Sequence, residues 1–211
     1  MERSTNQQPD DLVRLDVSVP IWDRFFMVAP LVVIGTREQD GDYDLAPKHM
    51  VTPLGWENYF GFVCTPEHAT YQNIRRDEVF TVSFPTADAV VLASLAASPR
   101  CGDHSKPALL ALPRFKATTI DGEFLTQSTL FFECKLDRIV DGFGDNSLIA
   151  GKIISAMISA AALRSMDVDD QEMIAESPLL AFLAPTRYAS INRSHAFPFP
   201  AGFQKTRDTE S

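Results

Sequence analysis

Residues 65–74 combine side-chain donors with the predicted start of a short helix. Thr70 is expected to cap this helix, which we predict to run through about residue 76. The first turn of a helix exposes unpaired N–H groups at the positive end of its dipole, and both features favour phosphate. His68 and Asn73 add donors at the same place. The segment therefore suits a phosphate group, with an ordinary capped helix and a surface histidine as the alternative.

Residues 44–53 form a second polar segment, interrupted by two prolines. We expect an irregular loop that carries Lys48, His49 and Thr52. Clustered donors on a rigid loop suit the recognition of an anion or of a polar ring. A surface connection whose polar side chains meet only water explains the same residues.

Other candidate motifs predict no chemistry. Cys101 and His104 are three residues apart, but zinc needs about four ligands and no second pair is suitably spaced, so we predict no metal site. Gly142 and Gly144 lack the third glycine of a dinucleotide fingerprint, and a hairpin turn explains them better. The local signatures of NTP hydrolysis, of serine esterases and of zinc proteases do not occur in the sequence.

The charge of the chain limits its partners. The 211 residues include 19 Lys and Arg and 28 Asp and Glu, which gives a formal net charge of −9. An acidic chain without a long basic run argues against nucleic acid or an anionic membrane as the main partner. A phosphate on this protein must therefore be held by donors gathered locally.

Length and cysteine usage predict one domain, residues 1–211, in a reducing compartment. Domains commonly have roughly 100–200 residues. Three scattered cysteines do not form a disulfide framework, which fits a cytoplasmic location. No apolar run reaches about 18 residues without polar interruption, so we expect no membrane span.

The pattern of apolar runs predicts a mainly β fold. We expect strands over residues 28–36, 59–64, 79–84, 115–120 and 129–140, and helices over residues 86–97, 106–111 and 169–175. Asp-Gly turns at residues 40–41, 121–122 and 141–142 indicate antiparallel pairing. Closing such a sheet removes its edges, which favours a β-barrel with short peripheral helices. Residues 1–20 and 204–211 are expected to form a polar arm and a frayed tail.

The order of several short motifs resembles the flavin reductase-like family. A strand ending in Gly35-Thr36 precedes Asp40-Gly41 and the loop Leu45-Ala46-Pro47. The motif His-Ala-Thr-x-x-Asn-Ile follows at residues 68–74, and residues 178–188 resemble the terminal strand of the family. The resemblance covers about residues 25–191.

The resemblance implies a split β-barrel, antiparallel and of Greek-key type, that binds FMN, with FAD possible and NAD(P)H as a co-substrate. It implies that the ring lies near residues 46–52 and the phosphate near residues 65–73, and it assigns no catalytic residue. It also implies a homodimer with the flavin near the interface, and it favours a strand over residues 148–158, where local periodicity favours a helix. The implied cofactor contacts are Ala46, Lys48, His49, Met50, Thr52, Thr65, His68, Ala69, Thr70 and Asn73.

Five positions depart from the usual pattern of the family. Asp44 replaces Asn, His49 replaces Ser, and His68-Ala69 replaces Lys-Asp. Asn146 lies near a position where a histidine is common on the nicotinamide side of flavin reductases, which puts NAD(P)H use in doubt. Besides the flavin reductase, an electron carrier without NAD(P)H turnover and a barrel without flavin therefore remain alternatives.

Overall fold

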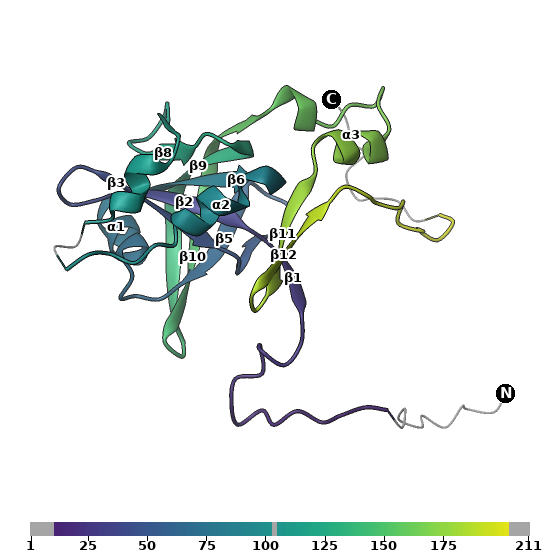
Figure 1. The fold of residues 1–211 in the computed structure, drawn as a ribbon, viewed down its shortest axis with the longest axis horizontal. Coiled ribbons are helices and arrows are strands. Elements are labelled where there is room, and N and C mark those ends of the chain that lie inside the picture. The colour runs from purple at the N-terminus through teal and green to yellow at the C-terminus, as the bar shows by residue number, and fades with distance from the viewer. Residues whose placement is uncertain (1–10, 103–104, 203–211) are drawn as a thin grey trace.

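A computed structural model describes residues 11–102 and 105–202 of the chain (Figure 1). The expected tail over residues 204–211 and the expected role of His104 lie outside these ranges. Within them, none of the helices has the length and apolar character that crossing a membrane requires.

A curled antiparallel sheet of seven strands forms the body of the molecule (Figure 1). In spatial order its strands are β3 (Tyr43–Lys48), β2 (Val32–Arg37), β6 (Val79–Pro85), β9 (Ser128–Phe143), β10 (Asn146–Ile158), β5 (Tyr59–Cys64) and β4 (Val51–Pro53). Fully buried side chains such as Phe62, Phe80 and Ile149 fill its interior. The prediction of a mainly β, antiparallel split barrel is confirmed, and the strand expected over residues 148–158 is present as β10.

Two smaller sheets contain the other strands of the described residues. One contains β1 (Met27–Pro30), β11 (Leu179–Ala184) and β12 (Arg187–Ile191), and the other contains β7 (Arg114–Lys116) and β8 (Glu123–Leu125). The expected single strand over residues 28–36 is wrong because the chain changes sheets at Leu31. Residues before it pair with β11, and residues after it pair with β3 and β6.

The helices are short and peripheral. They are α1 (Ala69–Asp77), α2 (Val90–Leu95) and α3 (Asp170–Glu176), with 3-10 turns η1 (Ala87–Ala89), η2 (Pro107–Ala111) and η3 (Ala160–Ala162). Helices were expected close to α2, η2 and α3. Asp169 caps α3 as predicted, because its side chain accepts a hydrogen bond from the N–H of Gln171 at 2.8 Å.

Four further local predictions are wrong. The strand expected over residues 115–120 ends at Lys116, because the N–H groups of residues 118–120 bind the Glu133 carboxylate and no neighbouring strand. The N-cap of α1 is His68, without a side-chain capping bond, and Thr70 lies inside the first turn and is buried. Much of residues 44–53 is strand, because β3 pairs along its whole length with β2 and β4 pairs with β5. The predicted turn at residues 141–142 lies within β9, since pairing with β10 continues to Phe143 and the hairpin turns after it.

Glu133 of β9 anchors the segment between β7 and β8. Its side chain is fully buried and accepts backbone hydrogen bonds from Thr118, Thr119 and Ile120 at 2.7–3.3 Å, and one from the Thr118 hydroxyl at 3.0 Å. Burial alone would raise the pKa of this carboxyl, but the four donors outweigh burial and lower it. The carboxylate thus fixes a loop that has no strand partner of its own.

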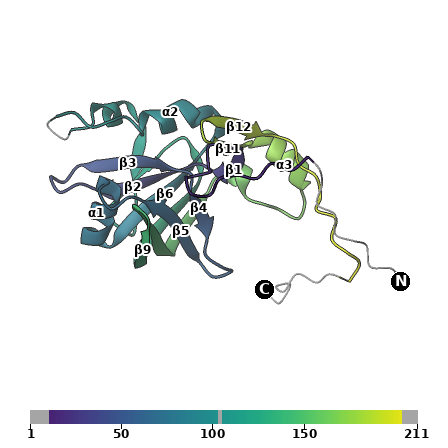
Figure 2. The same ribbon diagram turned by 90° about the horizontal axis from the view of Figure 1, so that it is seen from below.

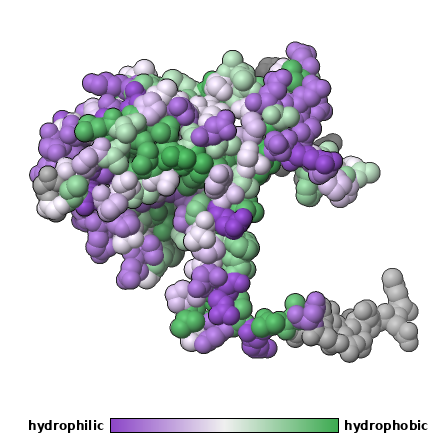
Figure 3. All heavy atoms as spheres, in the orientation of Figure 1, coloured by the Kyte–Doolittle hydropathy of each residue, from purple (hydrophilic) through white to green (hydrophobic). Residues whose placement is uncertain are grey.

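Residues 11–26 extend away from the body as an arm (Figures 1 and 2). The described part of the arm contains no strand or helix. The space-filling view shows hydrophilic and hydrophobic residues interspersed along it (Figure 3), and Val13, Val17, Trp22 and Phe26 are each more than half exposed. An arm of this composition is expected to bury its side chains against another surface.

Candidate functional site

A cavity of about 410 Å³ brings together parts of the two predicted segments. Ala46 and Lys48 of β3 form one wall, and His68, Ala69 and Thr70 at the start of α1 form another. The third wall is the chain that leaves α2, residues 96–100, together with Lys106. Five of the ten predicted cofactor contacts therefore line one hollow.

The position of α1 beside this cavity is fixed by side-chain bonds to β2. The amide of Asn73 donates to the Thr36 hydroxyl at 3.1 Å, and both residues are buried. Arg76 donates to the Asn73 side chain at 3.1 Å and to the carbonyl of Arg37 at 2.5 Å. The side chain of Asn73 is thus engaged within the protein, so we assign it to holding α1 in place.

Lys48 supplies positive charge to the cavity. Among the described residues it has no carboxylate within ion-pair distance. Burial, and then the charge of Lys48, lower the pKa of His68, so this histidine is neutral at pH 7. Burial raises the pKa of Cys64, which keeps that nearby thiol protonated. Lys48, which also interacts with the Cys64 thiol, therefore lines the same cavity as the first turn of α1 and has no carboxylate partner among the described residues.

Asp44 pairs with the two cations of the third wall, Arg100 and Lys106. Its buried carboxylate accepts a hydrogen bond from Lys106 at 2.9 Å and lies 3.2 Å from the Arg100 guanidinium. Lys106 also donates to the carbonyl of Leu45 at 2.9 Å, and Arg100 pairs with Glu38 as well. These ion pairs hold Arg100 and Lys106 against β3.

Sequence reasoning missed Arg100 and Lys106 as site residues. The available signal was the acidic Asp44 at a position where the family usually has Asn. A buried carboxylate needs a paired cation, and a search for its partner leads to the basic residues that follow α2.

The remaining predicted residues lie around the cavity and not in it. His49 contacts the ring of Phe182, with 4.5 Å between ring centroids, and lines an adjoining cavity of about 470 Å³. Met50, between β3 and β4, and Thr52, in β4, are both exposed. The hydroxyl of Thr65 donates to the side chain of Asn146 at 3.3 Å, which connects the start of the α1 segment to the β9–β10 hairpin. Contact of these residues with a cofactor stays a prediction.

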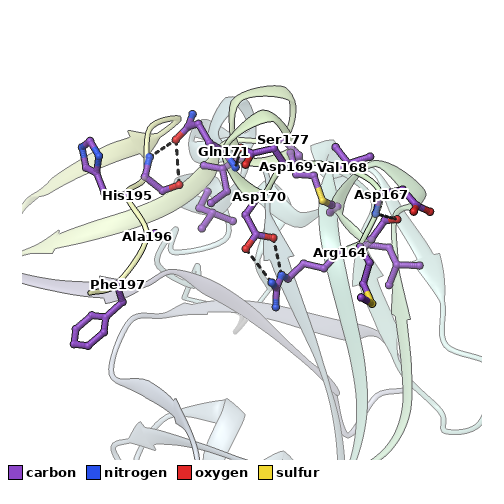
Figure 4. Close-up of a pocket in the computed structure, with 18 of the residues that line it drawn as sticks. Arg164, Asp167, Val168, Asp169, Asp170, Gln171, Ser177, His195, Ala196 and Phe197 are labelled. Carbon is purple, nitrogen blue, oxygen red and sulfur yellow. Dashed lines mark hydrogen bonds and ion pairs between the residues drawn. The ribbon is translucent and has the colours of Figure 1, made fainter. Parts of the chain in front are cut away.

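A larger cavity, about 1350 Å³, lies between α3 and the chain that follows β12 (Figure 4). None of the predicted site residues lines it. Its polar groups bind one another: Arg164 donates twice to Asp170 at 2.9 Å, and Gln171 accepts from the Ser194 hydroxyl at 3.1 Å (Figure 4). Within the described residues, no group of three or more His, Cys, Asp or Glu side chains is arranged to hold a metal ion.

Comparisons with known proteins agree with this geometry. A family model described as the flavin reductase like domain matches residues 24–182. Three solved structures share the fold, each with 18% sequence identity. Flavoredoxin from Methanosarcina acetivorans has a TM-score of 0.72 and covers 91% of this chain and 97% of its own. The FMN-binding protein from Thermus thermophilus, with bound 1-cyclohex-2-enone, has a TM-score of 0.67 and covers 93% and 99%. The 2-nitrobenzoate 2-nitroreductase NbaA from Pseudomonas fluorescens has a TM-score of 0.69 and covers 84% and 88%.

Proposed function

The chain belongs to the flavin reductase-like domain family, and from this premise we propose that it is an FMN-binding oxidoreductase. The observation that carries the proposal is the cavity lined by both Lys48 and the first turn of α1. The family model supports a flavin, and the Thermus thermophilus neighbour is named for binding FMN.

We assign the phosphate of FMN to this cavity. The N–H groups of Ala69 and Thr70 lie in the first turn of α1, where no preceding helical carbonyl can accept from them. Lys48 adds a positive charge with no carboxylate in ion-pair distance among the described residues. Two carboxylates also line the cavity: Asp44 is paired with Arg100 and Lys106, and Glu67 is exposed. The cavity therefore offers oriented amides and Lys48 to a phosphate. This arrangement offsets the loss of the lysine that the family usually carries at the position of His68. It also answers how a chain with a net charge of −9 can hold a dianion.

We assign the flavin ring to the region of residues 46–52, where β3 ends and β4 begins. Bound FMN supplies the hydride or electron chemistry, and the protein binds and orients it. Backbone N–H groups of this segment would stabilise negative charge on the reduced ring. None of the described side chains is needed as an acid or a base for that role.

NAD(P)H is the proposed electron donor, and one contact favours a second candidate function. Asn146, near the place where a histidine is common in flavin reductases, accepts a hydrogen bond from Thr65 instead of offering an imidazole. That substitution favours an electron carrier without NAD(P)H turnover. Anaerobic mixing of the FMN-loaded protein with NADH or NADPH separates the two: bleaching of the flavin supports the reductase, and an unbleached flavin supports the carrier.

We also propose a homodimer in which the arm, residues 11–26, packs its apolar side chains on the second copy. The exposure of Val17, Trp22 and Phe26 supports this assignment, because side chains of this size are seldom left in water together. The flavin would then lie near the interface between the two copies.

Paired titrations with FMN and riboflavin test the phosphate assignment. Lys48→Gln should weaken FMN binding about tenfold to a hundredfold, since a hydrogen bond to a charged group contributes about 1.5–3 kcal/mol. Riboflavin lacks the phosphate, so its affinity should stay unchanged. Lys116→Gln, on the exposed strand β7, is the matched control and should alter neither. Equal losses for both ligands in Lys48→Gln would place the phosphate elsewhere.

A further inference from the structure

The cavity that adjoins the proposed phosphate site has a different chemical character. Its volume is about 470 Å³, within the range of small-molecule sites. Most of its wall is apolar and comes from three parts of the chain, α2, the end of β3 and the β11–β12 hairpin. The apolar lining residues are Leu31, Pro47, Val90, Val91, Ala93, Ala97 and Phe182.

A tilted, stacked pair of aromatic rings forms one side of this cavity. The His49 and Phe182 rings have centroids 4.5 Å apart and planes inclined by 35°. Phe182 pairs with Tyr188 across the β11–β12 hairpin, which places both side chains on the same face of that sheet. Burial, and then the charge of Lys48, lower the pKa of His49, so its ring is neutral at pH 7. A planar ligand ring can stack against such a surface without displacing a charge.

Arg187 provides the charge of the cavity. It follows the hairpin turn, lines the cavity beside Thr186 and Tyr188, and is exposed. Among the described residues no carboxylate lies within ion-pair distance of its guanidinium. Its planar fork matches a carboxylate, which it can bind through two parallel hydrogen bonds.

The two cavities are neighbours. Pro47 and Ala97 line both, so β3 and the end of α2 form a common wall. A molecule in the adjoining cavity would lie beside residues 46–52, where we assign the flavin ring.

From these features we propose that the adjoining cavity binds a planar aromatic carboxylate, with its ring against His49 and Phe182 and its carboxylate on Arg187. The role of this carboxylate as the co-substrate of the flavin rests on the proposed function, whereas the binding of the carboxylate to the cavity does not. The ligand class follows from an apolar wall, an aromatic surface and a single cation at the rim.

Benzoate binding to the protein without flavin, measured by calorimetry, tests the proposal. Benzoate should bind, and benzamide, which has the same ring and no charge, should bind at least about fivefold more weakly. Arg187→Gln should weaken benzoate about fivefold to tenfold and leave benzamide unchanged, because only the charge-assisted contact is lost. Arg193→Gln, an exposed arginine outside the cavity, is the matched control and should change nothing.

A second variant tests the cavity without relying on Arg187. Val91 is 64% exposed on α2, so Val91→Glu should preserve the fold, which circular dichroism checks. The new carboxylate in the cavity wall should repel benzoate and lower the affinity for benzoate about tenfold or more. Undetectable benzoate binding, or equal affinity in the wild type, Arg187→Gln and Val91→Glu, would overturn the proposal.

Titration of the same preparations with FMN separates this proposal from the proposed function. Benzoate should bind equally well to protein loaded with FMN. Mutual exclusion of the two ligands would overturn a separate subsite, because the cavity would then belong to the flavin itself. Benzoate binding without any FMN binding would refute the proposed function and leave the carboxylate site standing.

Discussion

Replacing Asp44 with asparagine, the residue usual in the family, should destabilise this particular chain. The side chain of Asp44 is 5% exposed and that of Lys106 is 8% exposed, and their charged atoms lie 2.9 Å apart. Asp44→Asn removes the negative charge and keeps one acceptor oxygen. The ammonium of Lys106 then stays buried without a counter-charge, and the new amide N–H group lies close to one of the two cations.

The size of the effect follows from burial. Removing one partner of a buried ion pair commonly costs about 3–5 kcal/mol. We expect the lower end, about 3 kcal/mol, because Lys106 keeps its hydrogen bond to the carbonyl of Leu45 and Arg100 keeps Glu38. For a chain of this size, a loss of about 3 kcal/mol lowers Tm by roughly 6–12 °C.

Thermal and urea unfolding of three variants measure this effect. Asp44→Asn should show the full loss, and Asp44→Asn combined with Lys106→Met should recover at least about 1 kcal/mol, because the second change removes the unpaired charge. Asp121→Asn is the control: its pair with Arg37 is about half exposed and should contribute less than about 1 kcal/mol. If Asp44→Asn unfolds within 1 °C of the wild type, the ion pairs of Asp44 with Arg100 and Lys106 do not stabilise the fold.

Three further predictions concern a buried carboxylate, a histidine and the arm. Glu133→Gln should cost about 2–3 kcal/mol in urea unfolding, because an amide replaces a charged acceptor of four hydrogen bonds. The pKa of Glu133 is lowered from its ordinary 4.5, so its contribution to the free energy of unfolding is full above pH 4.5 and is lost as the pH falls through the lowered pKa. An unchanged urea midpoint of Glu133→Gln above pH 5 would contradict this role. Burial, and then the charge of Lys48, lower the pKa of His68 from 6.5, so this histidine gains its charge only below pH 6.5. FMN should therefore bind more tightly as the pH falls below 6.5, and His68→Gln should lose this increase. Identical pH profiles of FMN affinity for the variant and the wild type would exclude His68 from the phosphate site. Light scattering should show a dimer that dissociates when Val17 and Trp22 are both changed to Asp, and a monomeric wild type would remove the proposed interface.

Much of the barrel could be predicted because the apolar runs are short and their ends are marked. Residues 59–64 form β5 with the predicted bounds, since Thr65-Pro66 stops the strand. Residues 148–158 were ambiguous by periodicity, because apolar residues recur at helical spacing while Ile and Ser are frequent enough for a strand, and only the family resemblance identified the strand. The run around Leu31 could not be divided from the sequence, because a continuous apolar run does not show that its two halves pair with different sheets.

The sequence predicted two segments of the candidate site but not the third wall of the cavity. Ala46, Lys48, His68, Ala69 and Thr70 were identified from local donors and family motifs, and all five line one cavity. Arg100 and Lys106 follow a helix that is distant in sequence, and their place depends on a tertiary ion pair with Asp44. Pairing of that kind has no local pattern, which is why sequence analysis found the acid and missed its partners.

Equilibrium titration of the purified chain with FMN, followed by flavin fluorescence and calorimetry, tests the central claim most directly. We expect saturable binding of about one FMN per chain, at least about tenfold tighter than riboflavin, because Lys48 and the first turn of α1 hold the phosphate. Failure of FMN to bind at millimolar concentration, in protein shown to be folded, would contradict the assignment of this chain as a flavoprotein.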